Sequence, residues 1–162
     1  MNLTHPIGEL LRACTDPGLE RPQRMAPALA ALTEQLRSLA LLGARLYVAQ
    51  VFFLSGLTKL RDWGTTLALF EDEYRVPLLS PQLAAWLGTG GELLLPALLL
   101  LGLGGRFAAA GLSVLNLVAV LSLAEIAPAA LLGHQLWGAL LLAVLLCGAG
   151  RWSLDAWLGR QR

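Results

Sequence analysis

Charged side chains are scarce in this chain: they make up 14% of its 162 residues, while apolar residues make up 56%. A soluble domain carries about 25% charged and about 45–50% apolar residues. A net charge of only +1 also excludes a nucleic-acid-binding protein and an intrinsically disordered one. Together with a mean hydropathy of +0.63, the composition predicts a protein embedded in the lipid bilayer, where apolar residues can face outward.

Cysteine and histidine are rarer still, with two of each. Cys14 and Cys147 lie far apart, which argues against a CxxC dithiol and a disulfide framework. Of His5 and His134, only His134 adjoins an apolar segment, so one chain cannot bind haem between two intramembrane histidines. No spacing of these residues is typical of zinc. The sequence therefore predicts no metal ligands and no covalently bound cofactor.

Four apolar stretches follow residue 38, and a helix of about 20 residues crosses the roughly 30 Å of bilayer hydrocarbon. They are Leu39–Leu60, Leu83–Leu103, Phe107–Ile126 and the shorter Gln135–Gly150. The polar and aromatic connection Arg61–Gln82 predicts a short interfacial helix that ends before Pro77. The other connections, Gly104–Arg106 and Ala127–His134, are short, so neighbouring helices run antiparallel. We expect an all-α integral membrane fold, an antiparallel bundle of four transmembrane helices.

Residues 1–38 differ from this membrane domain, which we assign to residues 39–160. The first part contains four prolines and charges of both signs, and no long apolar core follows Met1, unlike a secretory signal peptide. Within it, Ala28–Leu39 predicts a short amphipathic helix that leads into the membrane. We expect residues 1–38 to form a cytoplasmic tail.

Basic residues set the expected orientation, because cytoplasmic loops carry an excess of lysine and arginine. Three lie on one side of the predicted bundle: Lys59, Arg61 and Arg75. Nine lie on the other: Arg12, Arg21, Arg24, Arg37, Arg45, Arg106, Arg151, Arg160 and Arg162. This distribution predicts cytoplasmic N and C termini. Trp63 and Trp86 then suit the outer interface, and Trp152 and Trp157 the inner one.

Lys59 and Glu92 are the most informative polar residues, because charged side chains at membrane depth are expensive. Lys59 ends the first span, and Glu92 lies about 13 Å along the second, so the two can meet inside an antiparallel hairpin. Ser55 precedes Lys59 by four residues and shares its helix face. Glu125 and His134 fall at the outer ends of the third and fourth spans and would complete an outward-facing polar cluster. Two interpretations remain open: an ion pair that locks the hairpin, or a polar pocket that binds a ligand.

Other intramembrane features favour structural roles. We expect Arg45 to extend its guanidinium to the cytoplasmic headgroups, and Arg106 to anchor the end of the second helix. Gly88, Gly90 and Gly91 form a dense small-residue patch. Such residues let helix backbones approach closely in lipid, which indicates tight packing.

Three segments read RLYVAQVFFLSGLTKL (residues 45–60), GGELLL (90–95) and LGLGGRFAA (101–109). They resemble the DoxX family of small bacterial membrane proteins: the first looks like the family's opening helix, and the other two look like its glutamate-bearing helix and the arginine after it. Residues 148–155 (GAGRWSLD) closely resemble the family's ending. The resemblance, together with the four-helix layout, covers about residues 40–160.

The resemblance implies a protein of the bacterial inner membrane. Members of the family are described as a subunit of a thiosulfate:quinone oxidoreductase and as partners in membrane-linked oxidoreductase complexes. The residues at family-like positions are Arg45, Gly56, Lys59, Glu92, Arg106, Ser153 and Asp155. Locally, Ser153 can cap a C-terminal interfacial helix that begins at Leu154, with Asp155 in its first turn, which gives the SLD ending a structural role.

Three functions follow as hypotheses. The first is an accessory subunit of a membrane-associated redox or detoxification system, which holds a partner enzyme and contacts quinone around Lys59 and Glu92. The second is a small transporter or a scaffold without chemistry, in which a homodimer would supply the helices that a transporter needs. The third is an assembly or maturation factor that docks its partner through residues 1–38. The catalytic residues stay unassigned.

Overall fold

The computed structural model describes residues 27–159, which form six helices and no strand within that range. They are α2 (Pro27–Arg61), α3 (Trp63–Asp72), α4 (Pro81–Leu101), α5 (Gly105–Ser122), α6 (Pro128–Cys147) and α7 (Leu154–Gly159). Four of them, α2, α4, α5 and α6, are long and apolar enough to cross a membrane. The predicted all-α membrane bundle is therefore confirmed for the described residues. The predicted tail falls partly outside them, at residues 1–26.

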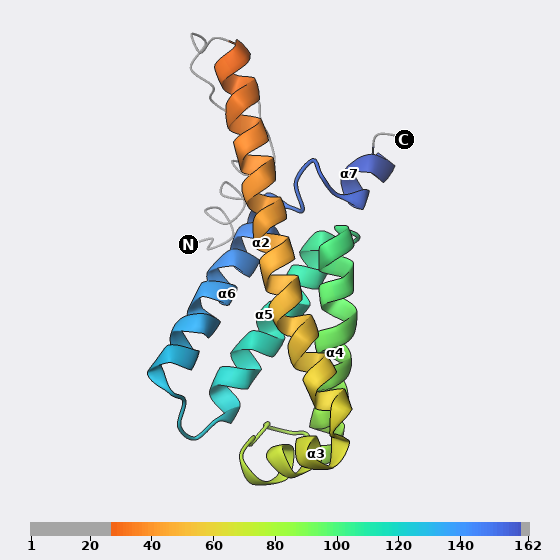
Figure 1. Ribbon diagram of the computed structural model, residues 1–162, viewed down its shortest axis with the longest axis vertical. Helices are drawn as coiled ribbons and strands as arrows, with labels where there is room; N and C mark the ends of the chain where they lie inside the picture. The colour runs from red at the N-terminus through yellow and green to blue at the C-terminus, as the bar shows by residue number, and fades with distance from the viewer. Residues whose placement is uncertain (1–26, 160–162) are drawn as a thin grey trace, which may run out of the picture.

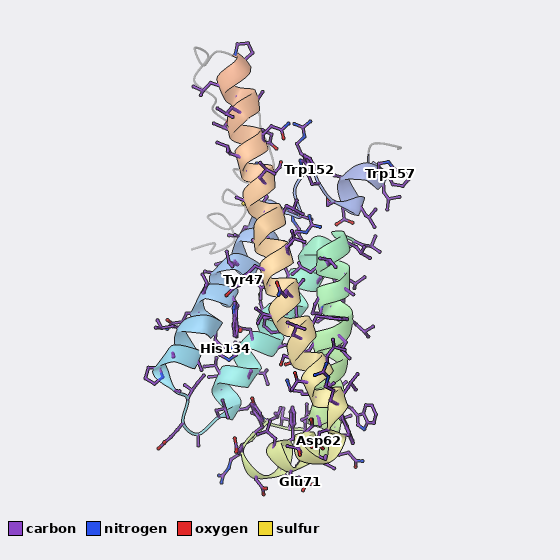
Figure 2. All side chains as sticks on the ribbon, viewed as in Figure 1. Tyr47, Asp62, Glu71, His134, Trp152 and Trp157 are labelled. Atoms are coloured by element: carbon purple, nitrogen blue, oxygen red, sulfur yellow. The ribbon has the colours of Figure 1, made fainter. Side chains whose placement is uncertain are left out.

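In the bundle α4 packs on both α2 and α5, and α6 packs on α5 and α2 (Figure 1). α3 lies across one end of the bundle, as the predicted interfacial helix, and ends before Pro77. α7 lies at the opposite end, where Figure 2 also shows Trp152 and Trp157. The two ends of the bundle are therefore distinct, one closed by α3 and the other by the loop before α7.

Local signals explain where the helices begin and end. Ser80 accepts a hydrogen bond from the Leu83 amide at the start of α4, and Pro81 occupies the first helical turn. Asp62 caps α3 by accepting from the Thr65 amide at 3.0 Å. Gly102 ends α4 with φ of +67°, a left-handed conformation that a side chain there would strain, and a Cβ would also lie 2.6 Å from Arg45 Nη2.

Several predicted boundaries are wrong. The third span ends at Ser122 and not at Ile126. The segment Ala28–Leu39 is not a separate amphipathic helix, because α2 runs without interruption from Pro27 to Arg61. The fourth span begins at Pro128 and not at Gln135, so most of the predicted connection Ala127–His134 is helical. Proline is well placed at the start of a helix, since its missing N–H has no intrahelical partner there.

Glycine permits close helix contacts at two positions. Within the predicted small-residue patch this holds for Gly91, whereas Gly90 faces open space. A Cβ added at Gly91 would lie 2.7 Å from a methyl group of Leu115 on α5. A Cβ at Gly56 on α2 would lie 2.9 Å from Leu93 on α4. Since lipid supplies little drive for helix association, these close approaches favour the packing of α2 on α4 and of α4 on α5.

Arg45 does not reach the headgroups, so that expectation is wrong. Its side chain is buried, with 1% of the residue exposed. The guanidinium donates to Leu99 O at 2.9 Å and Leu100 O at 2.8 Å, at the C-terminal end of α4. It also donates to Ala149 O at 2.7 Å and Trp152 O at 2.9 Å in the segment after α6. One side chain thereby ties α2 to α4 and to the segment that leads into α7.

The residues that follow α6 complete this closed end. Ser153 Oγ accepts from the Ala156 amide at 3.2 Å, so it caps α7 as predicted. The Asp155 carboxylate reaches across to α5, where it accepts from the Gly104 and Gly105 amides at 2.9 Å each. Charge-assisted bonds to a helix N-terminus are favourable, because they satisfy free amides and oppose the helix dipole. The SLD ending therefore has a structural role in this chain.

Candidate functional site

The predicted meeting of Lys59 and Glu92 is present. The Lys59 Nζ lies 2.5 Å from Glu92 Oε2, which joins α2 to α4. Lys59 Nζ also donates to Ser55 Oγ at 2.9 Å, one turn earlier on α2. The Lys59 and Glu92 side chains retain 16% and 15% exposure. The pair is therefore largely buried but keeps some solvent exposure. An ion pair that only holds two helices together needs no such exposure.

The exposed side of the pair faces a cavity of about 420 Å³ between α3, α4 and α5. Its polar lining comes from Lys59, Glu92, Tyr74 and Ser122, and the remaining lining residues are apolar apart from a glycine. Apolar lining side chains include those of Phe70, Leu79, Leu87, Val114, Leu115 and Val118. An apolar cavity with a few polar groups is the usual form of a small-molecule site.

The connection between α3 and α4 forms one wall of the cavity. Tyr74 pairs with Leu123 in an isolated antiparallel bridge, and the Arg75 amide donates to Ser122 O at 2.9 Å. Phe70 stacks on Tyr74 with ring centroids 5.0 Å apart. These contacts fix the Tyr74 phenol against the end of α5. In the described residues its hydroxyl group has no hydrogen-bond partner.

Burial raises the pKa of Tyr74 above its ordinary value of 10.0, and the negative charges of Glu92 and Glu73 raise it further. The folded protein therefore holds this phenol neutral at a pH where an unfolded tyrosine is half ionised. The stability that follows from this shift is present below pH 10 and is lost as the pH rises through the folded pKa.

We expect Glu92→Gln to lower the pKa of Tyr74, because the substitution removes one of the negative charges that oppose the phenolate. The chain has two tyrosines, so an ultraviolet titration in a Tyr47→Phe background reports Tyr74 alone. Glu125→Gln serves as the control, since Glu125 is exposed and does not line the cavity. A Tyr74 titration that Glu92→Gln leaves unchanged would show that the two groups do not share the cavity.

The structure brings only part of the predicted four-residue cluster together, because neither Glu125 nor His134 lines the cavity beside Lys59 and Glu92. Asn116 Nδ2 donates to the His134 carbonyl at 2.9 Å, and Asn116 Oδ1 lies 2.8 Å from His134 Nδ1. Because the amide group is oriented by the first bond, Nδ1 must carry the hydrogen of the second. His134 thus belongs to the α5–α6 contact.

Sequence reasoning did not single out Tyr74 or Ser122. Tyr74 stands in a polar connection, where no periodicity relates it to α4 or α5, and only the bridge to Leu123 places it in the cavity. Ser122 is a single hydroxyl residue at the end of a span. The sequence gives one indication for Tyr74: a tyrosine has an aromatic ring with a polar hydroxyl group, which suits the membrane interface.

The family comparison agrees with this architecture. The DoxX family model matches residues 40–125, which is more than half of the chain. The chain belongs to the DoxX family. The match includes α3, α4, α5 and the part of α2 that holds Arg45 and Lys59, so the whole cavity lies within the DoxX domain. Residues 148–155 lie beyond the matched range. Comparison with curated proteins and with solved structures gives no match.

Proposed function

We propose that this DoxX protein binds a quinone-class ligand in the cavity beside Lys59 and Glu92, and that it serves as an accessory subunit of a quinone-linked redox system. The observation that carries the proposal is an intramembrane ion pair that opens onto an apolar cavity with unused hydrogen-bond donors.

The size and the lining of the cavity suit an amphipathic ring. A volume of about 420 Å³ lies within the range of about 300–1,000 Å³ typical of small-molecule sites. Leu79, Leu87 and Val114 are partly exposed and line the cavity, so the isoprenoid chain of a quinone can leave along an apolar surface. The headgroup would then lie against the polar residues and the chain would extend towards lipid.

The polar groups offer donors, which a quinone needs because its two carbonyl oxygens only accept hydrogen bonds. A lysine ammonium has three N–H groups, and Lys59 uses two of them on Ser55 and Glu92. The third is available for one carbonyl oxygen, and the Tyr74 hydroxyl is available for the other. A tyrosine hydroxyl is protonated at physiological pH, and the upward shift in the pKa of Tyr74 moves it further from ionisation, so it can donate.

The cellular setting is part of the same proposal. We place the protein in the bacterial inner membrane, with the α7 end of the bundle in the cytoplasm, as the distribution of basic residues along the sequence favours. The cavity, at the α3 end, would then open near the outer leaflet. A partner protein would supply the electrons, and the DoxX chain would hold the quinone beside it.

Filling the cavity tests the proposal without touching a charge. Ala119 lines the cavity, and Leu121 on the same helix is exposed. We expect Ala119→Phe to weaken binding of a short-chain quinone analogue at least about tenfold, since the added ring occupies the site of the headgroup. Leu121→Phe is the matched control and should bind as the wild type does. Titration of the analogue in nanodiscs, followed by tryptophan fluorescence, gives both affinities, and equal affinities for the two variants would refute the proposed site.

A further inference from the structure

The face of α2 that points away from the bundle carries a seven-residue repeat. Exposed leucines occupy 29, 32, 36, 39 and 46, and exposed Phe53 continues the same spacing of three and four residues. The two intervening positions are Gly43 and Gln50. The buried residues of α2, such as Ser38, Arg45 and Phe52, lie on the opposite face. A spacing that averages 3.5 residues is the pattern by which two helices pack along each other.

The first part of this face lies outside the bundle. α2 has 35 residues, or about 52 Å, whereas the hydrocarbon layer is about 30 Å thick. Figure 1 shows that its N-terminal turns project past the ends of α4, α5 and α6. Leu32 is 54% exposed and Leu36 is 57% exposed on this projecting segment. Lipid tails cannot cover leucines that lie beyond the hydrocarbon layer.

The second part of the face holds a polar group at membrane depth. Gln50 is exposed near the middle of Leu39–Leu60, and its amide makes no hydrogen bond to any residue that the structure describes. It lies in a groove of about 260 Å³ with Leu46, Phe53 and, from α4, Ala97 and Leu100. Hydrocarbon offers an amide no hydrogen-bond partner, so the free side chain is costly there.

We propose that α2 pairs in parallel with α2 of a second copy of this chain, with the two Gln50 amides bonded to each other at the centre of the contact. A second copy covers the projecting leucines and supplies the Gln50 partner at once. A small ligand in the groove would meet Gln50 and leave the leucines exposed. In a parallel pair, identical positions face each other, so each amide group can donate to the other.

Gly43 supports the same pairing. It lies in the repeat between Leu39 and Leu46, and a Cβ built there has no atom within 4 Å. The surface at this position is therefore open, and the backbone of a partner helix can come close. Small residues at such positions are typical of helix contacts in membranes.

Cysteine cross-linking in membranes tests the pairing in the full chain, in a Cys14→Ser/Cys147→Ser background. We expect Leu32→Cys and Leu36→Cys to form disulfide-linked dimers about fivefold faster than Ala31→Cys, which is exposed on the same projecting segment but off the repeat. Copies with two different tags should co-purify after cross-linking. Equal rates at the three positions would overturn the proposal. It would also be overturned if no cross-linked product carried both tags.

The role of Gln50 has a separate readout. We expect Gln50→Leu to raise the dimer dissociation constant about three- to tenfold, as measured by energy transfer between labelled copies in phosphatidylethanolamine–phosphatidylglycerol vesicles. Gln135→Leu is the matched control, since Gln135 is exposed on α6, away from the repeat. An unchanged constant for Gln50→Leu would contradict the amide contact.

Discussion

Arg45→Met is expected to lower the free energy of unfolding by about 3–5 kcal/mol, the largest effect of any single substitution that we predict. The substitution removes four hydrogen bonds from the guanidinium to carbonyl oxygens of α4 and of the segment after α6. Those carbonyl oxygens lie in a buried or partly buried region. Without the guanidinium they lose a charged hydrogen-bond donor, and water replaces that hydrogen bond only in part. α4 and the segment before α7 should therefore separate from α2. Unfolding in mixed detergent, followed by circular dichroism, measures the change.

Two further variants show whether the loss comes from the guanidinium itself. Arg45→Lys keeps the charge but presents its donors from one point, so it cannot reproduce a planar fork with bonds to two chain segments. We expect it to lie between Arg45→Met and the wild type. Arg61→Met, at the exposed end of the same helix, should change the free energy of unfolding by less than about 0.5 kcal/mol. If Arg45→Met were as stable as Arg61→Met, the buried guanidinium would not hold the bundle.

Variants of the Lys59–Glu92 ion pair are expected to affect the free energy of unfolding and ligand binding in different ways. Lys59→Met leaves the Glu92 carboxylate without its partner, and Glu92→Leu leaves the ammonium likewise. Each should cost about 1–3 kcal/mol, since the pair is largely sheltered. The double variant Lys59→Met/Glu92→Leu should recover most of that loss, because an apolar pair of similar volume often replaces a buried ion pair without penalty.

Quinone binding should not recover in the double variant. We expect all three variants to bind a short-chain quinone analogue at least about tenfold more weakly than the wild type. Each variant removes the Lys59 ammonium, the Glu92 carboxylate that pairs with it, or both. An ion pair that only locks the hairpin predicts the opposite, namely wild-type binding in the stable double variant. Measurement of stability and binding on the same preparations thus distinguishes the two interpretations of Lys59 and Glu92.

Most of the fold could be predicted from the sequence, because hydropathy alone marks segments that must lie in lipid. The helix boundaries could not be read from hydropathy, since Pro27 and Pro128 begin helices outside the apolar stretches. The surroundings of Arg45 could not be predicted for a related reason. Its four acceptors lie 54 to 107 residues away in sequence, and extension to the headgroups is the simplest expectation for a lone arginine near a helix end.

Part of the candidate site could also be predicted. The meeting of Lys59 and Glu92 follows from helix rise and antiparallel packing alone, because the depth of a residue in the bilayer increases by a fixed rise per residue along a helix. Glu125 and His134 share a similar predicted depth, but α5 ends at Ser122, so Glu125 lies in the connection after it. For His134, depth does not determine the direction of the side chain around α6. His134 instead bonds Asn116, and the cavity gains Tyr74 from a connection whose path no helical period determines.

Photolabelling with a short-chain azidoquinone tests the central claim most directly, because it reports where a quinone lies on the full chain. Our account predicts that the label attaches to the segment Tyr74–Leu79 or to the α5 segment Val114–Ser122, which line the cavity. It also predicts that an excess of unlabelled analogue suppresses this labelling. Label that follows lipid exposure, with α6 marked as strongly as the cavity and no suppression by the analogue, would contradict the account.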